Sequence, residues 1–186
     1  MNEPVVKRFY WSTPDDVIAI THDGSVAQPP FPPGIENLAD TPLKNQVAIL
    51  TKIRDADGRG IGIGSELEWT DGETLHVAFT ITLPGRGVLV SYQTKNYAHP
   101  DLIELFGKVA STGEPWSGEL PVVATDGPAS RGRGQIIGGT GEFEGAAGSM
   151  YQTMNFRRID ASGAVSFNEE TYIFDGGSTP SAPPPA

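Results

Sequence analysis

The sequence lacks cysteine and holds only three histidines. Without cysteine there are no disulfide frameworks, thiol nucleophiles or cysteine-ligated zinc and iron–sulfur sites. His22, His76 and His99 are isolated and form no H-E-x-x-H motif, so no metal hydrolase site is expected. The glycine runs 58–64 and 132–138 lack the spacing of a nucleotide-binding loop and open no helix. We therefore expect no metal and no other cofactor.

Basic residues are also scarce, with 13 Lys and Arg against 23 Asp and Glu, which gives a net charge of −10. A nucleic-acid partner is not expected, because binding of the phosphate backbone needs a basic footprint. No apolar run approaches the roughly 20 residues of a membrane span, so no membrane partner is expected either. The N-terminus lacks the apolar core of a signal peptide, and we expect a cytoplasmic protein.

Glycine and proline are abundant, with 23 and 16 residues, which favours short strands joined by many turns. Eight antiparallel strands with one inserted helix at 100–109 predict an all-β fold, a closed eight-stranded barrel whose interior is filled by side chains or holds one small ligand. A sandwich of seven to nine strands is the alternative. The expected strands are 46–55, 61–69, 74–83, 88–95, 119–125, 133–137, 150–158 and 165–174.

The N-terminal part, residues 1–45, is expected to be an arm in front of a barrel domain at 46–175. Thr13 and Pro14 followed by two aspartates predict the start of a short helix. The aromatic cluster at 9–11 favours an arm that closes over the barrel as a helical lid, and an ordinary N-terminal arm is the alternative. Residues 176–186 are expected to be a disordered, Pro-rich tail.

The string GGTGEFEGAAG at 138–148 resembles the G-G-x-G-x-F-x-G-A-x-G signature of the allene oxide cyclase and dirigent superfamily. The stretch LTKIRD at 50–55, followed by Ile61 and Gly62, is similar to the first hairpin of that superfamily. Within the superfamily, the strand pair 74–95 and the turn ATDG at 124–127 look most like the bacterial spirotetramate- and spirotetronate-forming cyclases of polyketide biosynthesis. The resemblance spans roughly residues 46–175.

This resemblance implies a cofactor-free cyclase that promotes an intramolecular Diels–Alder-type cycloaddition. Its partner would be a hydrophobic polyene small molecule that folds back on itself to form a spiro-linked ring. Such an enzyme acts by holding the reactive conformation and excluding water. Two other functions stay open: a lipocalin-like carrier that returns its ligand unchanged, and a dirigent-like protein that directs the coupling of radicals made elsewhere.

Strand alternation gives each expected strand two faces, and the resemblance helps to select the inward one. It places Glu66 and Glu68 inside the barrel, and Glu68 matches a pocket position of allene oxide cyclases. The opposite face, from Ile61 to Trp69, is more apolar, so patterning alone predicts the reverse, with both glutamates solvated. Burial of the outer face in a homo-oligomer would reconcile the two arguments.

The candidate site residues follow from these faces and from the arm. Carboxyls buried in an apolar barrel would have raised pKa values and could bind a polar ring. The catalytic candidates are Glu66, Glu68, Gln93 and Tyr151, although Gln93 and Tyr151 could instead lie on exposed faces. The substrate-binding candidates are Thr51, Val77, Phe79, Ser91, Val122, Thr153, Asn155, Phe9, Tyr10, Trp11 and Ile18.

Overall fold

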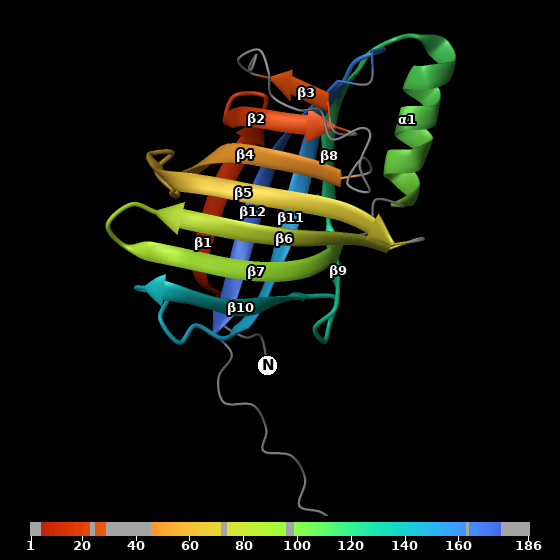
Figure 1. Ribbon diagram of the computed structural model, residues 1–186. Helices are drawn as coiled ribbons and strands as arrows, with labels where there is room; N and C mark the ends of the chain where they lie inside the picture. The colour runs from red at the N-terminus through yellow and green to blue at the C-terminus, as the bar shows by residue number, and fades with distance from the viewer. Residues whose placement is uncertain are drawn as a thin grey trace, which may run out of the picture.

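A computed structural model describes residues 5–22, 25–28, 46–71, 74–95, 99–162 and 164–175. These residues form a closed antiparallel barrel of eight strands with one helix beside it (Figure 1). The predicted all-β barrel and its inserted helix are thus confirmed. The elements are β1 (Val5–Thr13), β2 (Val17–His22), β3 (Ser25–Gln28), β4 (Gln46–Arg54), β5 (Gly60–Asp71), β6 (Thr74–Leu83), β7 (Gly87–Lys95), α1 (Pro100–Thr112), β8 (Trp116–Val123), β9 (Thr125–Gly127), β10 (Gly134–Gly141), β11 (Gly148–Ile159) and β12 (Val165–Asp175).

The barrel wall runs in the order β4–β5–β6–β7–β10–β11–β12–β1. It closes where Tyr10 of β1 pairs with Arg54 of β4. The short strands β8 and β9 pair with β11 and β7 respectively, and β2 and β3 continue the sheet beyond β4. Closure pairs the edges of the wall strands, which would otherwise be open to other chains.

The N-terminal strand completes the ring in place of one of the expected strands. The expected run 119–125 became β8 and β9, which lie off the main ring, whereas β1 pairs with β12 over nearly its whole length. Phe9 and Trp11 point inward from β1 and are each 3% exposed, so this part of the expected arm belongs to the core. Residues 29–45 of the expected lid and residues 176–186 of the expected tail lie outside the described residues.

The predicted helix that starts near Thr13 is wrong. Residues 14–16 instead form a tight turn between β1 and β2. The Asp16 carboxylate accepts hydrogen bonds from the backbone N–H of Ser12 (3.1 Å) and from its hydroxyl (3.0 Å). An aspartate that bonds to nearby backbone in this way favours a turn over a helix.

Gly62 and Gly64 of β5 face the interior of the barrel and lie very close to residues of β6. A Cβ atom at Gly62 would lie 2.3 Å from the carbonyl oxygen of Thr82, and one at Gly64 would lie 3.0 Å from the Phe79 ring. Glycine at these positions therefore lets β5 lie close to the large side chains of its neighbours.

The glycine-rich string at 138–148 forms the end of β10 and the turn into β11. Gly141 has φ 61°, and a Cβ there would lie 2.2 Å from the carbonyl oxygen of Arg86. Glu142 binds Arg86 and Lys7 through its carboxylate, at 2.9 and 2.6 Å. Phe143, which is 5% exposed, enters the main core. The string that carries the superfamily resemblance thus has a structural role in fixing this turn to the β6–β7 hairpin.

Helix α1 covers a second group of core residues. It begins with Pro100, and it ends at Gly113, which has φ 68° and donates its N–H to the Val109 carbonyl oxygen at 2.9 Å. Leu102 packs with Val122 of β8 and with Met154 and Phe156 of β11. In the described part of the chain, no helix is long and apolar enough to span a membrane.

The barrel role of β1 predicts that core contacts from this strand are needed for stability. Phe9→Ala should lower the free energy of unfolding by about 3–5 kcal/mol, because it leaves a cavity in the main core. Tyr10→Ala, at the adjacent outward position, is the matched control and should cost much less. Urea unfolding followed by circular dichroism measures both values. Equal, small losses would contradict the placement of β1 in the core.

Candidate functional site

An apolar cavity of about 660 Å³ opens between one end of the barrel and helix α1. Its wall is almost entirely aliphatic and aromatic, and Glu68 is the only charged side chain in the wall formed by the described residues. It is lined by Trp11, Thr13, Val17, Ile20, Val47, Ile49, Glu68, Leu102, Ile103, Phe106, Met154, Phe156, Val165 and Phe167. Cavities of this size and character accept largely apolar small molecules, and a few polar groups fix the orientation of the ligand.

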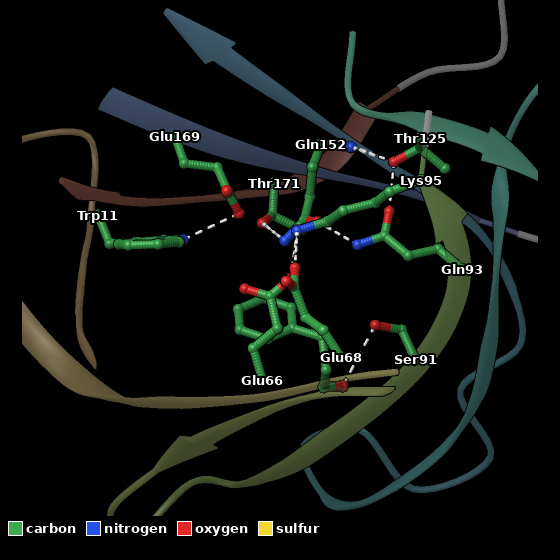
Figure 2. Close-up of polar contacts among 11 residues, drawn as sticks. Trp11, Glu66, Glu68, Ser91, Gln93, Lys95, Thr125, Gln152, Glu169 and Thr171 are labelled. Carbon is green, nitrogen blue, oxygen red and sulfur yellow. Dashed lines mark hydrogen bonds and ion pairs between the residues drawn. The ribbon is translucent and has the colours of Figure 1, made fainter. Parts of the chain in front are cut away.

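A buried ion cluster lies behind this wall (Figure 2). The Lys95 ammonium group from β7 binds the Oε1 atoms of Glu66 and Glu68 on β5, with a distance of 3.1 Å to Glu68. These three side chains are between 2% and 8% exposed. Glu68 belongs both to the cluster and to the cavity wall, so it connects the buried charges to the space that a ligand would fill.

Glu169 of β12 adds a third carboxyl to this region. It accepts a hydrogen bond from the Trp11 indole N–H at 2.9 Å, and its other oxygen, Oε2, has no hydrogen-bond partner among the described residues. Figure 2 shows the polar ends of Glu169, Lys95 and Glu66 directed toward the same part of the interior. We call Glu66, Glu68, Lys95 and Glu169 the charged cluster.

Burial dominates the titration of the charged cluster. It raises the pKa of Glu169 to about 8, although the Lys95 charge opposes the shift and the Glu66 charge adds to it. Burial also raises the pKa of Glu66, with the same opposition from Lys95 and a further increase from the Glu68 charge. At neutral pH, Glu169 is therefore a neutral carboxylic acid next to an ion pair.

A network of neutral groups lies beside the charged cluster. The Gln93 amide donates to the side-chain oxygen of Gln152 and accepts from the Thr125 hydroxyl. Gln152 donates its backbone N–H to Thr125 at 2.8 Å and its side-chain amide to Thr171 at 3.5 Å. These bonds tie β7, β9, β11 and β12 together and satisfy polar groups that would be costly to bury alone.

In the structure, Glu66 and Glu68 of β5 point into the barrel, as the superfamily resemblance predicts. Glu66 and Glu68 are buried, whereas Ile63 and Leu67 are 42% and 41% exposed. The orientation expected from apolar patterning is therefore wrong, because Lys95 supplies the counterion that lets carboxylates lie inside. Gln93 is also buried, as expected for an inward position.

The orientation expected for β11 is wrong. Tyr151 lies on the outer face and stacks on Tyr172 with a centroid distance of 4.6 Å. Thr153 and Asn155 share that face, while the alternate positions, with Gln152 among them, point inward. Both faces of this strand mix polar and apolar residues, so alternation alone did not distinguish them. The inward side chains are Met150, Gln152, Met154 and Phe156.

The other predicted substrate-binding residues divide between the cavity and the core. Trp11 lines the large cavity, and Tyr10 lines a second, smaller cavity. Ile18 is half-buried and is not part of the cavity wall, which its neighbours Val17 and Ile20 help to form. The remaining residues are buried but lie outside this wall: Phe9, Thr51, Val77, Phe79, Ser91 and Val122.

Sequence reasoning missed Lys95, Gln152 and Glu169. Lys95 continues the inward series of Ser91 and Gln93 at the expected spacing of two residues, so alternation could have placed it inside. Glu169 had no such signal, because no face was assigned to its strand. Lysine and glutamate are rarely buried unless they are paired, and the partners lie on strands far apart in the sequence.

The charged cluster holds an ammonium group between two of its carboxyls. In the described residues, no group of three or more His, Asp or Glu side chains is arranged to hold a metal ion. The Lys95 ammonium group bridges Glu66 and Glu68, where a cation would otherwise bind. The carboxyls can instead accept a hydrogen bond from a ligand or, when protonated, donate one.

The chain matches no known family model, and its sequence matches no curated protein.

The ion pair predicts a strong dependence of stability on Lys95. Lys95→Met should lower the free energy of unfolding by about 3–5 kcal/mol at neutral pH, because two buried carboxylates lose their counterion. The double variant Lys95→Met/Glu66→Gln should recover part of this loss, because it removes one of the unpaired charges. Denaturant unfolding of both variants tests this. Wild-type stability in the single variant would show that the ammonium group is not needed.

The raised pKa of Glu169 predicts a fall in stability with rising pH. Between its usual pKa of 4.5 and about 8, the folded protein keeps a proton that the unfolded chain releases. This group should therefore lower the free energy of unfolding by about 1 kcal/mol per pH unit across that window. Glu169→Gln lacks this contribution, so its stability relative to the wild type should grow from pH 5 to pH 8. A constant difference across this range would contradict the assignment.

Proposed function

We propose that this protein is a cofactor-independent cyclase that promotes an intramolecular Diels–Alder-type cycloaddition. The substrate is a linear, mostly apolar polyene with a polar tetramate or tetronate ring, and the product carries a spiro-linked ring of the kind made in polyketide-derived antibiotic biosynthesis. The observation that carries the proposal is the apolar cavity of about 660 Å³, in which Glu68 is the one acidic side chain of the wall that the described residues form. The resemblance to spiro-ring-forming cyclases supports the choice of reaction.

The cavity wall suits a reaction that depends on conformation. When the cavity holds the diene and the alkene of the substrate side by side, the substrate is restricted from many conformers to one reactive geometry. Orientation of this kind lowers barriers by up to about 7–11 kcal/mol in favourable cases. The aromatic and aliphatic side chains from β1, β11, β12 and α1 supply the apolar surface that stabilises a folded chain and excludes water.

Glu68 gives the cavity its polarity. In this proposal, the polar ring of the substrate lies against the Glu68 carboxyl and the polyene lies along the apolar wall. A hydrogen bond to the ring that strengthens as the new bonds form would stabilise the transition state. Lys95 holds the carboxyl in place from behind, at 3.1 Å.

The same cavity supports a second candidate function, a carrier of a hydrophobic small molecule. A carrier needs the apolar volume but not a group aligned with a reacting ring. The two functions differ in outcome, because a carrier returns its ligand unchanged.

The test is turnover of a linear polyene tetramate by protein that has been dialysed against a chelator. Mass spectrometry with NMR should detect an isomer of the same mass that carries the new ring. Glu68→Ala should lower kcat about tenfold or more, and it should still fold, because Lys95 keeps Glu66 as a partner. Leu67→Ala, at the neighbouring outward position, is the matched control and should turn over normally.

Three results would each contradict a different part of this proposal. Substrate that is bound and recovered unchanged would favour the carrier. Activity that returns only when metal is added would contradict the cofactor-independent reaction. Full activity of Glu68→Ala would remove Glu68 from the site.

A further inference from the structure

A second, smaller cavity of about 240 Å³ is lined by residues of β1, β4 and β12 and by Asp16. Most of its lining residues are of polar or charged types, with Asp16, Arg54 and Glu169 among them. A liquid water molecule takes up about 30 Å³, so the small cavity has room for several. Trp11 lines both this cavity and the large apolar one.

The charged cluster contributes one side chain to the lining of each cavity. Glu68 lines the large cavity and Glu169 lines the small one, and each is at most 8% exposed. Lys95 and Glu66 complete the cluster, and Lys95 contacts Glu68 directly at 3.1 Å. Figure 2 shows Glu169 and the Lys95 ammonium group directed toward one another from opposite strands. The two cavities thus share one set of buried, proton-binding groups.

The neighbours of Glu169 leave it able to exchange a proton. Inside the barrel it faces the charges of Lys95, Glu66 and Glu68, and from β1 it receives the Trp11 N–H. In the lining of the small cavity, Asp16 forms an ion pair with Arg54 at 2.6 Å. Glu170 accepts a hydrogen bond from the Tyr172 hydroxyl at 2.6 Å. Tyr10 is the other titratable group in that wall. Glu169 itself has the buried, unpartnered oxygen Oε2.

We propose that Glu169 is the solvent-side end of a proton path that leads through Lys95 to Glu68, and that this path protonates an acidic ring bound in the large cavity. The inference rests on the proposed function for its substrate class. A ring with an enol between two carbonyl groups is an acid that is ionised at neutral pH. Its oxyanion would otherwise lie against the Glu68 carboxylate, and like charges repel strongly in a site without water.

The protein takes up one proton from solvent for each ligand anion that it binds. Water in the small cavity gives a proton to Glu169, whose own proton passes to Lys95 as Lys95 gives one to Glu68. The O–H bond formed at Glu68 is then shared with, or passed to, the ring oxygen. The site as a whole keeps its charge when the anion enters, and the proton returns to solvent when the ligand leaves. A ligand that fills the large cavity does not block this path, because the path starts at Glu169, which lines the small cavity and not the large one.

The experiment uses an unreactive probe, a 3-acyl tetramic acid with a saturated alkyl chain, and its neutral O-methyl ether. Stopped-flow mixing with a pH-indicator dye in unbuffered solution measures proton uptake, and the change in tryptophan fluorescence measures binding. The wild type should take up about one proton per acid bound and none with the ether. Because Glu169 acts through Glu68 and does not contact the ligand, Glu169→Gln should bind at a similar rate but take up its proton at least tenfold more slowly.

A second variant tests the path without altering the charged cluster. Asn168 is exposed and lies in the wall of the small cavity. Asn168→Trp should fill that cavity and slow proton uptake, while Asn168→Ala, the matched control, should leave it fast. Uptake at the wild-type rate in both Glu169→Gln and Asn168→Trp would overturn the path, as would binding of the acid without any uptake. Failure of both probes to bind would instead overturn the substrate class of the proposed function, and this inference with it.

Discussion

The ammonium group of Lys95 is the contact on which the interior of the barrel depends. Charged carboxylates are stable away from water only when they are paired and hydrogen-bonded, and Lys95 pairs with two of them. The inward face of β5 consists of glycine and glutamate over most of its length, so this ion pair takes the place that apolar packing has elsewhere in the wall. Because Glu68 borders the large cavity, the same pair also sets the polarity of the space available to a ligand.

Trp11 links the closure of the barrel to the arrangement of its interior. The residue lies on β1, the strand that completes the ring, and it lines both cavities. Its N–H group binds Glu169 on β12, the strand paired with β1, at 2.9 Å. One side chain therefore contributes to the core, to the cavity wall and to the placement of a buried acid. Neither cavity would keep its shape if β1 were a detached arm.

Local patterns in the sequence were sufficient for most of the strands and for the helix. The turn at 84–87 acts within a few residues, so its effect could be read directly, whereas the helix expected at 100–109 ends three residues before α1 does. The site could be predicted only in part. Glu66 and Glu68 were placed inside by resemblance, against their polarity, and their partner Lys95 lies on another strand. The closing role of β1 depends on residues at the other end of the chain, and no local pattern reports such a pairing.

The pairing of β1 with β12 also affects how the chain reaches its final form. Trp11 and Glu169 are 158 residues apart, so the wall cannot close until almost the whole chain has been synthesised. Contacts of such large sequence separation slow folding, and until they form, β12 presents an open edge to other chains. During translation the nascent barrel is therefore an unclosed sheet whose N-terminal strand has no partner. A circular permutant that joins the end of β12 to the start of β1 would turn this slowest pairing into a hairpin, the fastest kind of strand pairing to form.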